Sequence, residues 1–152
     1  MNYFLDTSAL VKIYHRESGT DTVLGLYQST NELMISELSQ VEFVSSVHRK
    51  YRECKLTLEV LHAVVHKFED DMRQRYTLLP FSSAVIEEAN RLLLQFAAQH
   101  ALKTQDSLQL AFGKTYRNPS TIFGCADMKF LSFPRSRVGM CTAPIWRCGV
   151  VS

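Results

Sequence analysis

The segment NYFLDTSALVKIY, residues 2–14, places a short apolar run directly before a stretch with helical periodicity. Residues 2–5 are predicted to form a buried strand that ends at Asp6. Apolar residues then recur at the spacing of a helix over residues 8–15. A strand that runs directly into a helix is typical of α/β proteins, and it puts Asp6 at the carboxyl end of the strand.

The same alternation of strands and helices continues along the chain. Further strands are predicted over 33–36, 76–81 and 121–126, and further helices over 19–28, 37–53, 57–75, 82–100 and 105–116, the last capped by Thr104. Beyond residue 133 the prediction is limited to a short strand over 138–142. This order predicts an α/β fold with a mostly parallel central sheet of four or five strands flanked by helices.

The composition is that of an ordinary globular protein. The 152 residues are 46% hydrophobic and 21% charged, and their number fits a single domain over residues 1–152. No apolar run approaches the length of a membrane span, and no basic residue precedes the first apolar stretch, so we expect a cytoplasmic protein. The four cysteines contain no C-x-x-C pair, and we expect free thiols, with Cys54 and Cys125 packed inside.

Four acids fall where an open α/β sheet places its ligands. Asp6 ends the first strand, Asp127 follows the 121–126 strand, and Asp106 lies in the first turn of a helix. Glu42 lies early on the 37–53 helix, at the rim of its apolar stripe. Converging carboxylates repel one another unless a cation is present, and oxygen ligands suit Mg²⁺ or Mn²⁺. Such an ion can bind a phosphate and activate water.

Each acid also has a purely structural interpretation. An Asp just past a strand is often a turn former or a helix cap, which applies to Asp6. Asp106 can serve the dipole of its own helix. A helical Glu is usually solvated, and Glu37 is a nearby rival for the role of Glu42. Only the set of four acids together favours a metal site.

The apolar residues of two predicted helices form stripes along them. In the 37–53 helix they recur every three residues, and in the 57–75 helix they follow a wider stripe. The first set is Leu38, Val41, Val44 and Val47, and the second is Leu58, Leu61, Val64, Val65, Phe68 and Met72.

Four segments resemble the acidic motifs of PIN-domain ribonucleases, and most closely those of the VapC-type toxins of toxin–antitoxin pairs. They are FLDTSALVK (4–12), VEF (41–43), LKTQDSLQLA (102–111) and FGCADMKFL (123–131). The resemblance covers residues 2 to about 131 in the right order. The chain departs from the family pattern at Gln105, at Cys125-Ala126 and in a longer tail that carries Arg and Cys.

The resemblance implies a PIN-like three-layer fold and a Mg²⁺- or Mn²⁺-dependent endoribonuclease. It assigns metal binding to Asp6, Asp106 and Asp127, while Glu42 completes the catalytic set and positions or activates water. It also assigns a supporting hydroxyl to Ser8 or Thr7.

The resemblance also implies the partners. These are an RNA substrate, a small antitoxin that covers the cleft, and a second copy of the same chain. We expect the 57–75 helix and its flanks to form the subunit interface, although the same stripe can simply be core. The alternative function is a non-catalytic PIN-like module that binds RNA or a partner protein.

The charge balance is compatible with an RNA substrate. Without the four candidate acids, 11 Asp and Glu remain against 17 Lys and Arg, which leaves a net charge of +6. The candidate RNA-binding residues are Arg49, Lys50, Arg52, Arg135 and Arg137. A solvated helix face is an equally good interpretation for any one of them.

A second metal interpretation rests on His62 and His66, which stand four residues apart on one predicted helix. Glu69 and Asp70 follow one turn later. A zinc site needs a third ligand at a supported spacing, and the sequence offers none.

Overall fold

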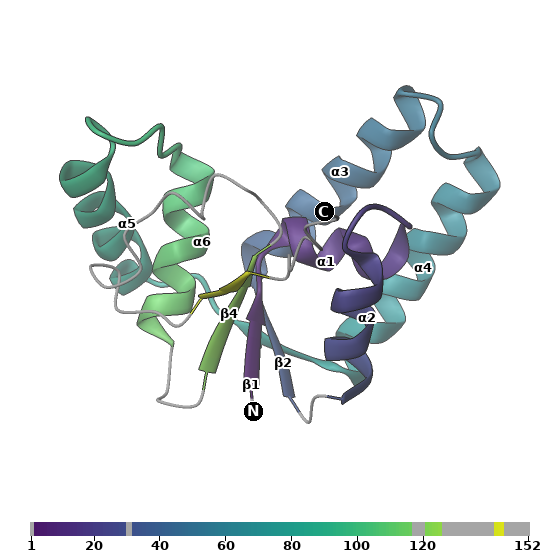
Figure 1. Ribbon diagram of the computed structural model, residues 1–152, viewed down its shortest axis with the longest axis horizontal. Coiled ribbons are helices and arrows are strands. Elements are labelled where there is room, and N and C mark those ends of the chain that lie inside the picture. The colour runs from purple at the N-terminus through teal and green to yellow at the C-terminus, as the bar shows by residue number, and fades with distance from the viewer. Residues whose placement is uncertain (1, 30–31, 117–120, 126–141, 145–152) are drawn as a thin grey trace, which may run out of the picture.

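A computed structural model describes residues 2–29, 32–116, 121–125 and 142–144. Strands and helices alternate in the predicted order (Figure 1). The strands are β1 (Asn2–Leu5), β2 (Glu32–Ser36), β3 (Tyr76–Leu79), β4 (Thr121–Cys125) and β5 (Thr142–Pro144). The helices are α1 (Thr7–Tyr14), α2 (Thr20–Ser29), α3 (Glu37–Arg52), α4 (Leu58–Gln74), α5 (Ser83–Phe96) and α6 (Thr104–Thr115).

The strands form one sheet in the order β3-β2-β1-β4-β5, and each neighbouring pair is parallel. This confirms the predicted α/β class with a parallel sheet. The strand order runs in opposite directions from β1, toward β2 and β3 on one side and β4 and β5 on the other. Such a point, at the carboxyl ends of the strands, is where open α/β sheets bind their ligands. Asp6 leaves the sheet at this point.

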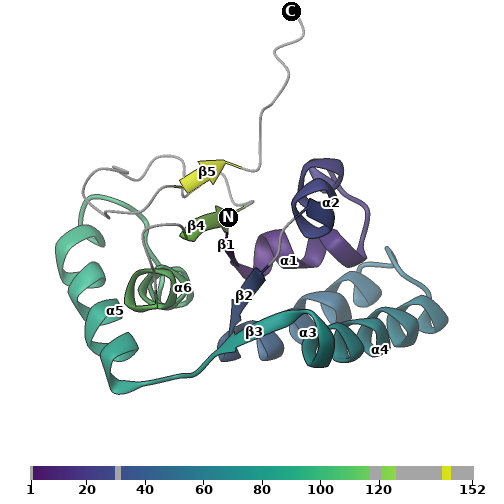
Figure 2. The same ribbon diagram turned by 90° about the horizontal axis from the view of Figure 1, so that it is seen from below.

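Two hydrophobic cores cover the two faces of the sheet because successive strand residues point to opposite sides. Phe4 and Met34 face the core built with α5 and α6, whereas Leu5 and Ile35 face the core built with α1, α3 and α4. Figures 1 and 2 show these helix groups on opposite sides of the strands. Each fully buried Leu or Phe contributes about 1.5–3 kcal/mol, so the two cores hold the sheet edge in a fixed place.

The inward face of α3 differs from the prediction. Val41 and Val44 are 71% and 39% exposed, while Glu42 and Phe43 are buried. A recurrence of three residues drifts by about 60° per step around a helix of 3.6 residues per turn, so the predicted stripe could not stay on one face. The true buried face contains Ser39, Glu42, Phe43, Val47 and Lys50. Glu42 therefore lies within the buried face of α3 and not at its rim.

Smaller differences concern the ends of α3, α5 and α6. Cys54 is exposed, contrary to prediction, because it lies in the turn that follows α3, where its φ is 56°. Cys125 is buried as predicted. Helix α5 ends at Phe96 and not near residue 100. Lys103 occupies the N-cap position of α6, so Thr104 begins the helix and does not cap it.

Helix α4 directs part of its apolar stripe into this chain. Leu61, Val64 and Phe68 belong to the core, whereas Leu58 and Val60 are 49% and 44% exposed. The central part of the predicted subunit interface is therefore core. The last strand was predicted over 138–142, and residues 138–141 of it lie outside the described residues. The described strand β5 begins at Thr142. No helix in the described ranges has both the length and the apolar character needed to cross a membrane.

Candidate active site

Asp6 is held at the carboxyl end of β1 by both neighbouring elements. Its backbone N–H donates to Gly124 O at 3.0 Å, which continues the β1–β4 pairing, and its side chain caps α1 by accepting from Ala9 N at 2.9 Å. The Ser8 hydroxyl lies 2.8 and 2.9 Å from the two carboxylate oxygens. The Cys125 thiol donates to Asp6 Oδ2 at 2.8 Å. The predicted role as a helix cap is therefore observed, and the same carboxylate also lines a cleft.

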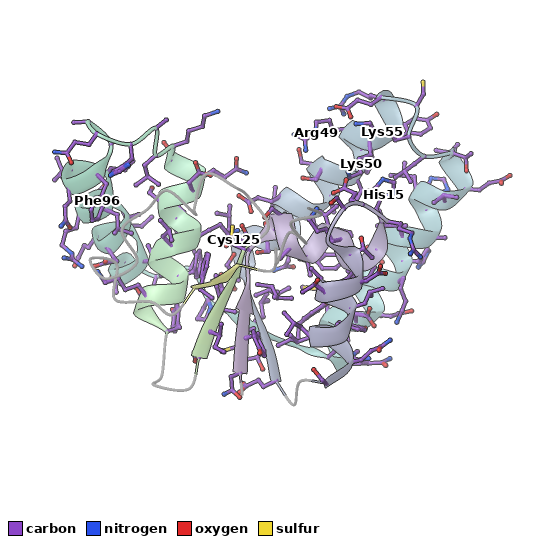
Figure 3. The ribbon with its side chains drawn as sticks, viewed as in Figure 1. His15, Arg49, Lys50, Lys55, Phe96 and Cys125 are labelled. Carbon is purple, nitrogen blue, oxygen red and sulfur yellow. The ribbon has the colours of Figure 1, made fainter. Side chains whose placement is uncertain are left out.

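Cys125 is a neighbour of Asp6 that the sequence analysis missed. The residue ends β4, beside the end of β1, and Figure 3 shows it in the region between the two groups of helices. Its Sγ also lies 3.9 Å from Ser8 Oγ. The signal in the sequence was the position of Cys125 two residues before Asp127, at the predicted end of the adjacent strand.

Glu42 is anchored through one of its two carboxylate oxygens. The Thr7 hydroxyl and the Gln109 amide both donate to Oε2, the latter at 2.5 Å. Oε1 is buried and has no hydrogen-bond partner among the described residues. An unsatisfied buried acceptor costs about 1–3 kcal/mol, and more when it is charged. The geometry therefore leaves Oε1 available to coordinate a cation or to accept a hydrogen bond from water.

Gln109 is the second site residue that the sequence analysis missed. It is 4% exposed and lies on α6, three residues after Asp106 and therefore on the same side of that helix. Its amide joins Glu42 to a pair of serines at the start of α3. A polar residue three positions after a candidate acid was the available signal.

Asp106 lies in the first turn of α6 and is less buried than the other two acids. Its Oδ2 accepts from the backbone N–H of Lys103 at 3.3 Å, so the predicted role at the helix N-terminus is observed. The residue also lines the same cleft as Asp6 and Glu42.

The cleft that contains these acids has a volume of about 620 Å³. Its lining combines Asp6, which follows β1, with acids and hydroxyls of α1, α3 and α6 and with basic residues of α1 and α3. The lining includes Asp6, Thr7, Ser8, Lys12, Glu17, Glu42, Arg49, Lys50, Arg52, Asp106 and Gln109. The cleft therefore offers positive charge to a polyanion on the same surface that carries the acids.

The basic side of the cleft contains one compact ion-pair cluster. Glu17 accepts from Lys12 at 3.2 Å and from Lys50, and Lys12 also donates to Ser18 O at 2.9 Å. Burial would raise the pKa of Glu17, but the hydrogen bonds from the two lysines outweigh it and lower that pKa. Burial, followed by the charge of Lys50, also lowers the pKa of His15. Lys50 is therefore a buried ion-pair partner, whereas Arg49 and Arg52 are exposed.

The remaining predicted site residues lie outside the described part of the chain. They are Asp127, Arg135 and Arg137. Within the described residues, no three His, Cys, Asp or Glu side chains come close enough together to hold a metal ion, and this includes the predicted His62 and His66 pair. His66 Nδ1 instead lies 4.0 Å from Glu69 on the surface of α4.

The donor chemistry of the cleft fits a hard divalent cation. The candidate ligands are carboxylate oxygens, which Mg²⁺ and Mn²⁺ prefer, and Glu42 Oε1 is a buried oxygen that lacks a hydrogen-bond donor among the described residues. Asp6 lies at the carboxyl edge of the sheet, and Asp106 lies in the first turn of α6. The two cores hold these separate elements in place.

Comparisons with known proteins agree with this architecture. Solved structures that resemble it include FitAcB from Neisseria gonorrhoeae, with a TM-score of 0.69, 15% identity, and coverage of 95% of this chain and 99% of that chain. The sarcin-ricin loop cleaving toxin VapC20 from Mycobacterium tuberculosis has a TM-score of 0.65, 15% identity, and coverage of 93% and 98%. A toxin–antitoxin complex from Klebsiella pneumoniae has a TM-score of 0.60, 13% identity, and coverage of 95% and 98%. No curated protein matches the sequence. Residues 3–119 match the family model of the PIN domain, and the chain belongs to this family.

Proposed function

We propose that the chain is a Mg²⁺- or Mn²⁺-dependent endoribonuclease that hydrolyses phosphodiester bonds of RNA. The observation that supports this most is the cleft itself. It lies at the carboxyl edge of a PIN-domain sheet and contains Asp6, Glu42 and Asp106 beside the exposed cations Arg49 and Arg52.

The acids have distinct roles in this proposal. Asp6, Asp106 and Asp127 hold the cation, and Glu42 completes the catalytic set. The cation, when bound, would neutralise charge on the phosphate and lower the pKa of a water. Glu42 Oε1 accepts a hydrogen bond from the attacking water and takes its proton, because this oxygen is not engaged by another described residue.

The hydroxyls next to Asp6 hold the carboxylates in place. Ser8 contacts both oxygens of Asp6, and Thr7 donates to Glu42 Oε2. The two adjacent residues at the start of α1 therefore orient two different acids. Arg49 and Arg52 bind phosphates on either side of the reacting one, since both are exposed on the wall of the cleft.

We further propose that the chain is the toxin of a toxin–antitoxin pair and acts in the cytoplasm. The similar structures include a toxin–antitoxin complex and an RNA-cleaving toxin, which supports a small antitoxin as the partner. An antitoxin that covers the cleft would block access to the acids. A second copy of the chain is the other expected partner.

The test incubates the purified chain with total cellular RNA and Mn²⁺ and maps the new RNA ends. EDTA provides one control and Asp106→Asn another. Asp6→Asn is tested in parallel, and circular dichroism shows whether the variants are folded. Asp70→Asn, a change of the same kind at an exposed acid of α4, serves as the matched control and should cut like the wild type.

Discrete cuts that need Mn²⁺, Asp6 and Asp106 would support the proposal. Cutting by Asp106→Asn at the wild-type rate would show that the site is wrong. A folded, antitoxin-free sample that neither cuts RNA nor is stabilised by Mn²⁺ would favour the alternative, a non-catalytic PIN-like module. For a chain that binds the ion, linkage predicts a stabilisation of about 2.7 kcal/mol at one hundred times the dissociation constant.

A further inference from the structure

Gln109 connects the start of α3 to the carboxylate of Glu42. Its Nε2 lies 2.5 Å from Glu42 Oε2, 3.1 Å from Thr7 Oγ1 and 3.3 Å from Ser39 Oγ. On the other side of the amide, Oε1 accepts from the Ser36 hydroxyl at 3.3 Å. All of these contacts are buried, so water does not compete with them.

The network fixes which way the Gln109 amide faces. Ser36 Oγ accepts from the backbone N–H of Ser39, and its own hydrogen goes to Gln109 Oε1 when the Ser39 hydroxyl, 2.9 Å away, donates to Ser36 Oγ. The opposite orientation of the amide would place its carbonyl oxygen against the Glu42 carboxylate, which has no hydrogen to offer when ionised. Only the observed orientation therefore satisfies both groups.

The contact also determines which Glu42 oxygen remains available. A glutamate side chain has several rotatable bonds. A single hydrogen bond to one carboxylate oxygen therefore leaves the position of the other oxygen undefined. Thr7 and Gln109 approach the same oxygen, Oε2, from two different helices. Two donors on one oxygen fix the plane and direction of the carboxylate, and Oε1 is left without a described partner.

We propose that Gln109 is a positioning residue for Glu42, which holds the carboxylate so that Oε1 contacts the divalent cation, in addition to the three aspartates assigned above, as well as the attacking water. This inference rests on the proposed function. Gln109 itself does not touch the reacting atoms in this assignment. In metal sites, a residue that hydrogen-bonds to a metal ligand sets the direction and the basicity of that ligand, and we assign this role to Gln109.

The test replaces Gln109 with Met, which keeps the length and unbranched shape of the side chain and removes the amide. Mn²⁺ binding is measured by titration calorimetry on the metal-free chain, so that one readout does not depend on activity. We expect the dissociation constant to rise by about 10- to 100-fold, the range for outer partners of metal ligands. With RNA, kcat should fall about tenfold while KM for RNA changes less than about twofold, because the RNA-binding wall is intact.

The matched control is Ser107→Ala on the same helix. Ser107 is fully buried, and this change removes its partly buried hydrogen bond to Thr104 O at 2.7 Å, which does not involve Glu42. It should lower thermal stability as Gln109→Met does and leave Mn²⁺ binding unchanged. If Gln109→Met does not fold, Gln109→Asn retains an amide but is too short to reach Glu42, and it should show the same loss.

A double-mutant cycle with Glu42→Gln separates positioning from a general loss of stability. Gln109→Met should have no further effect on Mn²⁺ binding once Glu42 has lost its charge. A folded Gln109→Met or Gln109→Asn chain with wild-type Mn²⁺ affinity would overturn the inference, and so would a wild-type chain that binds no Mn²⁺. If Mn²⁺ binds and RNA is not cut, the nuclease proposal fails, while the effect of Gln109→Met on Mn²⁺ affinity still decides the role of Gln109.

Discussion

Asp71 of α4 is buried beneath α1 and α2 and accepts hydrogen bonds from both. It is 2% exposed, and its Oδ2 accepts from the hydroxyls of Tyr14 at 2.9 Å and Tyr27 at 3.0 Å. Its Oδ1 accepts from Lys67 at 2.6 Å. Helix α1 begins with the residues that orient the candidate acids, so this carboxylate helps to fix the helix from which Asp6, Thr7 and Ser8 approach the cleft.

Asp71→Ala should therefore lower the free energy of unfolding by about 2–3 kcal/mol. Hydrogen bonds to a charged group contribute about 1.5–3 kcal/mol each. The contributions of the two tyrosine hydrogen bonds do not add in full. In the variant, Tyr14 keeps its contact with the Tyr76 hydroxyl at 2.9 Å, and the Tyr27 hydroxyl can hydrogen-bond to water. The contact of Lys67 adds little, since the Lys67 side chain is 62% exposed.

Denaturant and thermal unfolding of Asp71→Ala and Asp70→Ala measure this effect. Asp70 is the neighbouring acid, and its pair with Arg73 is exposed at 3.8 Å, so its loss should cost less than about 0.5 kcal/mol. For a chain of this size we expect a fall in Tm of about 6–10 °C for Asp71→Ala. Equal unfolding free energies of the two variants would refute the argument.

The same network predicts the direction of the pH dependence. Burial alone would raise the pKa of Asp71, but the hydrogen bonds from Lys67, Tyr14 and Tyr27 outweigh it and hold the pKa below its ordinary value. A carboxyl with a lowered folded-state pKa stabilises the fold fully above its unfolded pKa of about 3.9 and loses this effect as the pH falls further. The difference in unfolding free energy between the wild type and Asp71→Ala should therefore be constant near neutral pH and shrink below about pH 4.

Three further predictions concern the end of α3, the cleft wall and assembly. Cys54→Gly should stabilise the chain by about 0.5 kcal/mol in thermal unfolding, because φ 56° strains a residue with a β-carbon by more than glycine loses in entropy. Combined Arg49→Ala and Arg52→Ala changes should reduce the salt dependence of RNA binding by about 1.4 in log–log slope, since each phosphate contact on a single strand contributes about 0.7. An unchanged slope would remove both arginines from the RNA path. Sedimentation at micromolar concentration should show a dimer, and a monomer would contradict the expected self-association.

The parts of the fold that follow from local chemistry were predicted well. The apolar strands and the helix starts are properties of short segments, and the strand–helix order limits the sheet to a parallel one. The predicted stripe of α3 was wrong because a three-residue recurrence cannot stay on one face of a helix, and which of its valines are buried depends on the side that the sheet and α4 cover. Val41 and Val44 are as apolar as Val47, and only tertiary packing separates the two exposed valines from the buried one.

The candidate site shows the same division between local and tertiary information. Asp6 and Asp106 could be found from the sequence, since each stands at the end of a strand or the start of a helix. The hydrogen bonds of Gln109 and Cys125 join residues 67 to 119 positions apart and have no local signature. They depend on α6 and β4 being brought against α1 and α3, which no single segment specifies.

Capping and metal binding were weighed as alternatives for each acid, and the structure shows the capping contacts of Asp6 and Asp106. The N-cap bond of Asp6 to Ala9 and the bond of Asp106 to Lys103 each use part of a carboxylate that has about four acceptor positions. A cap therefore fixes where the group lies at the sheet edge, and a single capping bond does not by itself exclude a role in metal binding. Glu42, in the middle of α3, has no backbone N–H to cap. Its position must come from side chains, and for this reason the acid with the weakest signal in the sequence has the most extensive buried network around it, formed by Thr7, Gln109 and the serines of α3.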